Sequence, residues 1–391
     1  MKRADFERSP SGTLVPTERG QWAFVPKPLP PTNVDFGVLS SELADAAAAL
    51  GELNGVSRTL RNPYLLIRPL QAREALTSSS MEGTYTTLDD LLLVEAGAGE
   101  NNRAPDTREV LNYRVALSEA IGSMSSVPLS LRTLKNAHAR LLAGVSRQRG
   151  ATVRPGELKL HQNFIGSYAI ETARFIPPPR AETETCLSDL ELFIHREDRG
   201  GLHVLIDAAL IHYQFETVHP FADGNGRVGR MLVPLHLFTM GAIREPMLYI
   251  SPVLEPRKDE YIDRMFAVSQ NGDWIGWVRF FLEVLKLSAE ASIATSDQLR
   301  TLETGYRQRL QAAGRSANVL NVVDLLFETP VLSIPQIAAH LGVTYRAARM
   351  NVDTLVEVGI LEELPNTSSP KFYAARGILN IISGLQAQLS T

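Results

Sequence analysis

The residues of this chain that best suit chemistry form one stretch, His219-Pro220-Phe221-Ala222-Asp223-Gly224-Asn225-Gly226-Arg227-Val228-Gly229-Arg230. A Gly-rich turn that feeds a helix presents backbone N–H groups and a positive dipole end to a phosphate. Arg227 and Arg230 share one helix face and can fork onto phosphate oxygens. Asp223 suits a hard cation such as Mg²⁺, and His219 can take a proton near neutral pH. The stretch therefore predicts a phosphate site with a general base.

Two helices must position this stretch. After Gly226, an apolar stripe with helical spacing predicts a helix that leaves the two arginines off its buried face: Val228, Met231, Leu232, Leu235 and Phe238. A similar stripe before the stretch predicts a second helix: Ile206, Ala209, Leu210 and Tyr213. Pro220 disfavours helical backbone at His219, so we expect this helix to end there. The layout is helix, anion-binding loop, helix, with the base at the entrance.

Structural interpretations compete with this one. His219 alone could be a core histidine, and Asp-Gly-Asn-Gly alone could be an ordinary turn. His212, Glu216, His219 and Asp223 are spaced as zinc ligands on one helix face could be. Pro220 and the glycines break the helix that such a zinc site needs, and the two arginines at fixed offsets favour the phosphate site.

The stretch resembles the signature of the Fic family and matches it at every defining position. The resemblance implies transfer of AMP from ATP, with Mg²⁺, onto a hydroxyl of a target protein. It makes His219 the base, Asp223 the Mg²⁺ ligand, and Arg227 with Arg230 the holders of the β- and γ-phosphates. Gly224, Asn225 and Gly226 would line the anion hole, with Asn225 near the α-phosphate. Attack would be in line at the α-phosphorus, with pyrophosphate leaving.

A second segment gains meaning from the resemblance. A helix predicted from Leu70 to Ser80, with Pro69 in its first turn and Gly83 at its C-terminal cap, ends in Ser78-Ser79-Ser80-Met81-Glu82-Gly83. A Fic subgroup carries an inhibitory Ser/Thr-x-x-x-Glu-Gly/Asn motif, which Ser78 and Glu82 match. The resemblance implies that Glu82 reaches Arg230 and occupies the space of the γ-phosphate. Without that context, Glu82 would be a solvent-facing residue at a capped helix end.

Three further interpretations concern the core. Residues 154–166 and 173–179 look like the Fic region with a short β-hairpin, or flap, that aligns a target by strand addition; a plain structural loop is the alternative. Tyr249 and Tyr261 could border an adenine site or be simple core. His138 lies among apolar positions and is interpreted as structural.

Composition excludes several classes of protein. The 391 residues are 44% hydrophobic and 21% charged, which is ordinary globular composition, and the net charge of −4 argues against a chain-wide polyanion binder. The single cysteine, Cys186, excludes an internal disulfide framework. No secretion signal follows Met1, and no apolar run approaches the ~20 residues of a membrane helix. We expect a cytoplasmic protein with no membrane contact, and residues 1–36 read as an extended arm on the surface.

The last part of the chain resembles a winged helix-turn-helix. Its pattern predicts three helices, the third bearing Arg346 and Arg349, and then two strands at 360–364 and 371–373. DNA binding and protein contact or dimerisation are both uses of that fold. From Ser316 onward there are four basic and six acidic residues, 4 − 6 = −2, and this balance favours protein contact over DNA.

We therefore predict a mainly α protein: a helical Fic core with a short β-hairpin flap, and a C-terminal winged helix-turn-helix. The expected domains are an N-terminal region with the inhibitory helix (1–100), a catalytic core (101–290), a helical linker (291–314) and the winged helix (315–391). The expected function is adenylylation of Ser, Thr or Tyr on a target protein, or on the chain itself, inhibited by Glu82. Removal of AMP, transfer of another nucleotide or phosphoryl group, and a DNA-binding regulator with a Fic-type sensor are the alternatives. The inhibitory helix and the winged helix could each serve as a homodimer surface.

Overall fold

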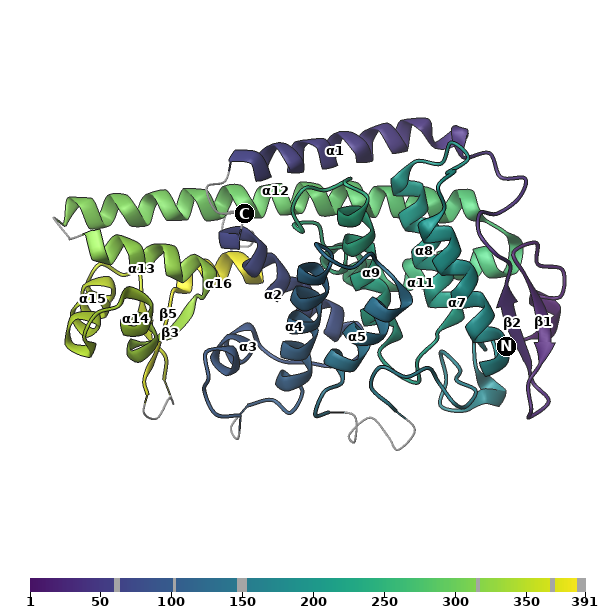
Figure 1. Ribbon diagram of the computed structural model, residues 1–391, viewed down its shortest axis with the longest axis horizontal. Helices are drawn as coiled ribbons and strands as arrows, with labels where there is room; N and C mark the ends of the chain where they lie inside the picture. Colours follow the sequence, from purple (N-terminus) through teal and green to yellow (C-terminus); the bar gives the residue numbers. More distant parts are fainter. Residues whose placement is uncertain (60–63, 101–102, 146–152, 314–316, 366–369, 385–391) are drawn as a thin grey trace. The chain divides into compact units, whose positions relative to one another are not determined.

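The computed structural model describes residues 1–391 except 60–63, 101–102, 146–152, 314–316, 366–369 and 385–391 (Figure 1). The chain is mainly helical with small antiparallel sheets, as the sequence predicted. Contacts divide it into two compact units, Met1–Glu52 with Val115–Ala289, and Leu53–Arg114 with Glu290–Thr391. The domain limits expected from the sequence remain predictions, and residues 101 and 314 lie outside the described residues.

Three helices run from one unit into the other: α1 (Ser40–Thr59), α4 (Thr107–Ser123) and α12 (Trp274–Ala312). The remaining elements of the first unit are η1 (Arg3–Asp5), β1 (Gly12–Pro16), β2 (Trp22–Pro26), η2 (Phe36–Leu39), α5 (Leu131–Leu141), η3 (Ile170–Thr172), α7 (Arg180–His195), α8 (Val204–Val218), α9 (Asn225–Thr239), α10 (Ser251–Leu254), η4 (Glu255–Arg257) and α11 (Lys258–Asn271).

Helices α8 and α9 form the centre of the first unit, where α8 packs on α9 and α7, and α5 packs on α9 (Figure 1). The expected end of α8 is confirmed, because His219 is its C-cap. The stripe of α9 is buried from Val228 to Leu235 as expected. Arg227 and Arg230 lie off that stripe, as the sequence predicted, yet they are 0% and 2% exposed, because α9 is covered by α5 as well as by α8.

The N-terminal arm is not only an extended surface segment. β1 and β2 pair as an antiparallel hairpin in which Thr13 faces Val25. Phe6 and Phe24 are 1% and 0% exposed and pack with Phe175. The interpretation of residues 1–36 as an extended surface arm was therefore wrong for the two strands. Their prolines argued against strand in the sequence, yet the strands form a hairpin whose aromatic side chains belong to the core of the first unit.

The predicted flap has the connectivity of a hairpin but little strand. Ile165 and Phe175 form one antiparallel bridge, with the Ile165 N–H donating to Phe175 O at 2.9 Å. The intervening loop contains η3, and its Tyr168 is fully exposed. The Phe24 N–H donates to Ile176 O at 2.9 Å, so the second half of the flap also bonds to β2.

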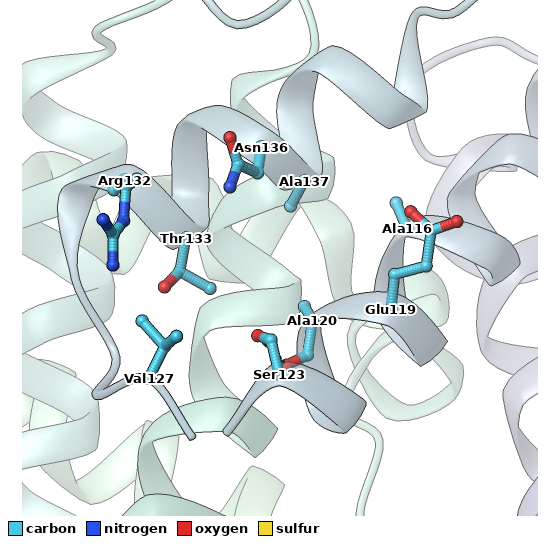
Figure 2. A pocket seen from close by; sticks show the side chains of 9 residues that line it. All are labelled: Ala116, Glu119, Ala120, Ser123, Val127, Arg132, Thr133, Asn136 and Ala137. Atoms are coloured by element: carbon cyan, nitrogen blue, oxygen red, sulfur yellow. Dashed lines mark hydrogen bonds between the residues drawn. The ribbon is translucent and has the colours of Figure 1, made fainter. Parts of the chain in front are cut away.

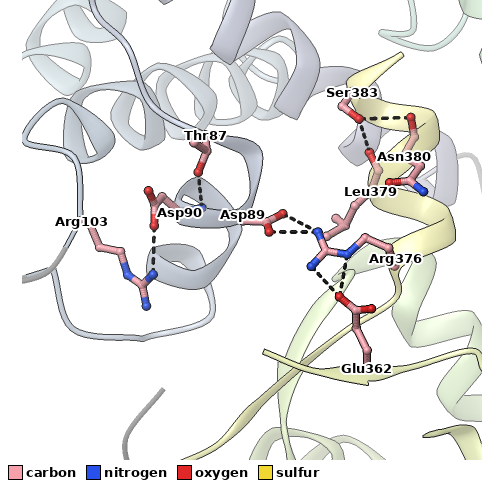
Figure 3. Close-up of polar contacts among 9 residues, drawn as sticks. All are labelled: Thr87, Asp89, Asp90, Arg103, Glu362, Arg376, Leu379, Asn380 and Ser383. Atoms are coloured by element: carbon pink, nitrogen blue, oxygen red, sulfur yellow. Dashed lines mark hydrogen bonds and ion pairs between the residues drawn. The ribbon is translucent and has the colours of Figure 1, made fainter. Parts of the chain in front are cut away.

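The remaining elements of the second unit are α2 (Tyr64–Ser80), α3 (Leu88–Glu95), α13 (Ala317–Glu328), β3 (Val331–Ser333), α14 (Ile334–Leu341), α15 (Tyr345–Glu357), β4 (Glu362–Glu363), β5 (Phe372–Ala374) and α16 (Arg376–Ser383). The strands form an antiparallel sheet in the order β3-β5-β4. Helix α2 packs on α13 and α16, and α3 packs on α16 and β3. Figure 3 shows the polar part of this packing, where Arg376 bonds to Asp89 of α3 and Glu362 of β4.

Helix α2 begins earlier than expected, at Tyr64, so Pro69 lies inside the helix rather than in its first turn. Its end agrees with the prediction: the helix stops at Ser80, and Gly83 has a φ of 77°. A left-handed backbone conformation at that place favours glycine.

The C-terminal segment has the three predicted helices, α13, α14 and α15, and a short strand that overlaps each of the two predicted strand regions. The sequence missed β3 and α16. The order of these elements is that of a winged helix-turn-helix, which remains a prediction for this segment. Among the helices that the structure describes, none combines the length and apolar character needed to cross a membrane.

Candidate active site

His219 has an unusual backbone conformation directly after α8. Its φ and ψ are 48° and 61°, the left-handed region that non-glycine residues seldom occupy and that often marks functional sites. Its Nδ1 lies 3.1 Å from the carbonyl oxygen of Glu216. Because a carbonyl only accepts, Nδ1 carries the proton in the neutral ring, and the lone pair is on Nε2. In this tautomer Nε2 is the ring nitrogen whose lone pair can accept a proton, as the predicted base would have to do.

The backbone around His219 is held by donors from residues 159–163. The Lys159 ammonium donates to Val218 O at 3.2 Å and to His219 O at 3.0 Å, and the Lys159 N–H donates to Pro220 O at 2.9 Å. The Asn163 amide donates to His219 O at 3.0 Å and to Phe221 O at 3.1 Å. Lys159 is 2% exposed, and burial lowers its pKa from 10.5 to about 7.

His138 of α5 supports the next part of the loop. The Gly156 N–H donates to its Nδ1 at 2.9 Å, so its Nε2 is the donor to Asp223 O at 2.9 Å. The ring also stacks on Phe221 at 3.9 Å between centroids. Burial lowers the pKa of His138 to about 4, which keeps the ring in this neutral form. The structural interpretation of His138 is thus confirmed, with a specific function: it holds the loop that carries Asp223.

Gly224 and Asn225 shape the start of α9. Gly224 has a φ of 80°, and a Cβ there would lie 3.2 Å from Leu141 Cδ2, so a larger residue would strain the turn. The Asn225 side chain bonds to both backbone groups of Phe221 at 2.8 Å and therefore closes the loop. With that side chain engaged, Asn225 and Gly226 can offer an anion their backbone N–H groups at the N-terminus of α9.

The charged residues of the stretch differ in burial. Arg227 and Arg230 are buried, whereas the Asp223 side chain is 31% exposed. Arg227 Nη2 lies 3.9 Å from Asp223 Oδ1, which also accepts the Gly224 N–H at 2.7 Å. A Mg²⁺ ion that travels with nucleotide phosphates needs only one or two protein carboxylates. A partly exposed carboxylate beside a helix N-terminus and buried guanidinium groups fits a Mg²⁺-bound polyphosphate.

The zinc alternative receives no support from the described residues, where no group of three His, Cys, Asp or Glu side chains could hold a metal. His212 is buried, its Nδ1 donates to Gly229 O at 3.0 Å, and the Tyr261 hydroxyl donates to its Nε2 at 2.9 Å. Tyr261 and Tyr249 are each 4% exposed, and the Tyr249 hydroxyl donates to Pro246 O. These bonds assign both tyrosines to the core.

Gly229 brings α8 and α9 close together. A Cβ at this position would lie 2.0 Å from Glu216 Oε1 and 3.1 Å from Phe215 Cδ1. This glycine therefore serves helix packing rather than phosphate approach.

Ser78 and Glu82 belong to the second unit, whereas residues 219–230 belong to the first. Ser78 is fully buried near the end of α2, and Glu82 lies in the turn after it and is exposed. The inhibitory function of Glu82 therefore stays a prediction.

A cavity of about 430 Å³ lies between α4 and α5 (Figure 2). It is lined by Ala116, Glu119, Ala120, Ser123, Val127, Arg132, Thr133, Asn136 and Ala137. None of the site residues predicted from the sequence is among them.

The sequence did not identify Lys159 and Asn163 as contributors to the site. A lysine and an asparagine in a loop are ordinary surface residues by type. Their position about 60 residues before His219 gives no periodic signal that would connect them with it.

Two regions of the chain match models of known families. Residues 40–122 match the model of the Fic/DOC family N-terminal region, and residues 128–237 match the Fic/DOC family model. The chain therefore carries a Fic N-terminal region followed by a Fic domain. The protein adenylyltransferase Fic of Drosophila melanogaster is 25% identical over 281 residues, which cover 70% of this chain and 52% of that protein. That of Drosophila mojavensis is 25% identical over 262 residues, covering 66% and 47%. The chain spans about half the length of these curated relatives.

Two solved structures share the fold. A Fic family protein from Desulfovibrio desulfuricans G20 has a TM-score of 0.55 and 22% identity, covering 89% of this chain and 98% of that one. A Fic domain containing signaling protein from Bacteroides thetaiotaomicron has a TM-score of 0.52 and 21% identity, covering 66% and 97%.

Proposed function

We propose that this protein transfers AMP from ATP to a Ser, Thr or Tyr hydroxyl of a target protein, or of the chain itself. The observation that carries the proposal is the arrangement of His219. Its Nδ1 is bonded to Glu216 O, which puts the lone pair of the neutral ring on Nε2, and His219 lies six residues before the first residue of α9. The Fic domain match and the adenylyltransferase names of the relatives support it.

The reaction uses the residues of the loop in distinct ways. His219 Nε2 takes the proton of the target hydroxyl while the hydroxyl oxygen forms a bond to the α-phosphorus. The bond between the α-phosphorus and the oxygen that bridges to the β-phosphate breaks, and pyrophosphate leaves. The N–H groups at the start of α9 stabilise the charge at the α-phosphate, and Arg227 and Arg230 hold the β- and γ-phosphates. Asp223 would hold a Mg²⁺ ion that neutralises phosphate charge.

The target is proposed to add as an extended segment to the flap. The bridge between Ile165 and Phe175 closes the loop, which contains the fully exposed Tyr168. An exposed backbone edge can align a target segment by main-chain hydrogen bonds without reading most of its side chains.

Glu82 is proposed to inhibit the reaction by pairing with Arg230. A carboxylate and a γ-phosphate compete for the same guanidinium fork, so ATP would bind in a position that is unsuited to attack. The order and spacing of Ser78 and Glu82, which match the inhibitory motif, support this proposal.

The test is label transfer from ATP labelled at the α-phosphate, with the chain and a protein extract as acceptors. It compares wild type, Glu82→Gly, Glu82→Gly with His219→Ala, and Glu100→Gly. The last is a matched control that removes a carboxylate paired with Arg108 in the same unit. We expect Glu82→Gly to raise labelling by at least about tenfold, or ~1.4 kcal/mol, because Arg230 becomes available to the γ-phosphate.

Loss of the label with His219→Ala would support the base, and wild-type labelling in Glu100→Gly would show that the effect belongs to Glu82. Equal labelling in wild type and Glu82→Gly would contradict the inhibitory function. Absence of label from every variant, while ATP still binds, would overturn the transferase and favour AMP removal, another donor or a regulatory function.

A further inference from the structure

The backbone from Val218 to Phe221 has an unusual number of side-chain donors around it. The carbonyl groups of Val218, His219 and Phe221 accept bonds from the side chains of Lys159 and Asn163, and Pro220 O accepts the Lys159 N–H. A helix end leaves its last carbonyl groups without helical partners, and water usually satisfies them. Here the side chains of Lys159 and Asn163 supply these hydrogen bonds instead.

We propose that Lys159 and Asn163 are positioning residues that hold His219 in its left-handed backbone conformation and thereby present Nε2 as the base. The inference deepens the proposed function, on which its catalytic meaning rests. Neither side chain has to touch the substrate, because both bond to backbone carbonyl groups of the segment that contains His219.

The lysine matches this position chemically. An ammonium group has three donors, and Lys159 Nζ has three acceptors, which are Asn163 Oδ1 at 2.8 Å, Val218 O and His219 O. It also lies at the C-terminal end of α8, where the helix dipole favours a cation. Burying a charged lysine is costly unless it is fully bonded, so an apolar residue would fill the space at lower cost. An apolar residue could not, however, bond the carbonyl oxygens of Val218 and His219 and the Asn163 amide at the same time.

Asn163 connects this cluster with the flap. Its Oδ1 accepts from Lys159, and its Nδ2 donates to the carbonyl oxygens of His219 and Phe221. Ile165, two residues later, forms the bridge with Phe175. The Gln162 side chain donates to Pro177 O at 2.8 Å, two residues after the bridge residue Phe175. The segment that would align the target and the residue that would take its proton are therefore fixed to the same few donors.

The first measurement is the tautomer of His219 by long-range ¹H–¹⁵N spectra of histidine-labelled protein, with His219→Ala to assign its signals. The variants are Lys159→Met, Asn163→Ala and Lys159→Arg. Lys286→Met is the matched control, because it removes a lysine charge from a more exposed ion pair with Asp45 in the same unit. We expect the Nδ1–H form alone in wild type and Lys286→Met, and a mixture of both tautomers in Lys159→Met. Lys159→Arg keeps charge and donors and should restore part of the wild-type signal.

The second measurement is kinetic and uses the Glu82→Gly background. Lys159→Met should lower kcat at least about tenfold while the Kd for Mg²⁺–ATP changes less than about threefold, because the base is displaced and the phosphate groups are not. A Kd that rises as much as kcat falls would contradict positioning.

Wild-type His219 signals in Lys159→Met, together with a lower melting temperature, would mean that Lys159 only stabilises the fold and would overturn the inference. If Lys159→Met fails to fold, Asn163→Ala decides, because it retains the ammonium and removes only the amide bonds. The spectra need no nucleotide. An absence of AMP transfer in all variants would therefore defeat the proposed function and still leave the spectra to decide the inference.

Discussion

Two opposing effects act on the charge of Lys159. Burial favours the neutral amine and lowers its pKa from 10.5 to about 7, whereas three acceptors and the end of α8 favour the ammonium. Below pH 7 the lysine is protonated in both folded and unfolded states. Between pH 7 and 10.5 the unfolded state binds more protons than the native state, so stability rises with pH in this interval.

The resulting prediction compares wild type with Lys159→Met by chemical denaturation at pH 7 and pH 9. The free energy of unfolding of wild type should rise by ~2 kcal/mol relative to the variant, since each pKa unit corresponds to about 1.4 kcal/mol. Lys286→Met should show no such difference from wild type. A constant difference between wild type and Lys159→Met would mean that the three acceptors keep the pKa of Lys159 near its ordinary value.

At the scale of residues, the sequence indicates a chemistry for the stretch 219–230 but not the side chains that hold its backbone. The types of His219 and Asp223 indicate a base and a cation ligand, because few other side chains do that work. The buried environment of Arg227 was not predicted, since a stripe of apolar residues describes one helix face and not how many neighbours cover the others. The function of Lys159 could not be predicted either, because it depends on contacts with residues about 60 positions away in the sequence.

At the scale of elements, the hairpin of β1 and β2 supports the flap. Phe24 is fully buried, with ring centroids 5.7 Å from Phe6 and 5.8 Å from Phe175. Its N–H bonds to Ile176 O, directly after the flap residue Phe175. The order of the flap therefore depends on a segment about 150 residues earlier in the chain.

We predict that Phe24→Ala lowers the free energy of unfolding by about 3 kcal/mol, as truncation of a buried phenylalanine usually does. It should also speed hydrogen exchange of the Ile165 and Phe175 amides, both of which donate within the flap bridge. Val25→Ala, a truncation at a half-buried position of the same strand, is the control and should leave that exchange nearly unchanged. Unchanged exchange in Phe24→Ala would mean that the flap is ordered without the hairpin.

The elements themselves were predictable where a pattern is strong. Helices α8 and α9 follow from their apolar stripes, and the end of α8 follows from Pro220. The hairpin was missed because its strands contain or adjoin prolines, which normally argue against strand. The predicted start of α2, at Leu70, was too late, because Pro69 was interpreted as a residue of the first turn. The helix in fact begins at Tyr64 and continues through that proline.

At the scale of the whole molecule, the distribution of charge bears on the function of the C-terminal segment. Three of its four basic residues form ion pairs: Arg349 with Asp353 at 2.9 Å, Lys371 with Glu363 at 2.6 Å, and Arg376 with Glu362 at 2.6 Å and with Asp89 at 2.9 Å (Figure 3). The carboxylates that neutralise them would repel a DNA backbone. The net charge of this segment can be counted from the sequence, but the ion pairs depend on the fold, because Asp89 is 287 residues from its partner Arg376.

We therefore predict that the full chain does not bind random duplex DNA in a salt-dependent way. Fluorescence anisotropy with a labelled duplex at 50 and 200 mM salt should show a Kd weaker than about 10⁻⁴ M at both concentrations, since non-specific binders reach that value through phosphate contacts. The double variant Asp353→Asn with Glu363→Gln releases Arg349 and Lys371 from their ion pairs and tests whether the carboxylates are responsible. It should bind measurably at 50 mM salt and lose affinity at 200 mM. Tight wild-type binding that falls steeply with salt would show that the segment contacts DNA despite its ion pairs, and a double variant that still fails to bind would mean that its shape, and not its charge, excludes the duplex.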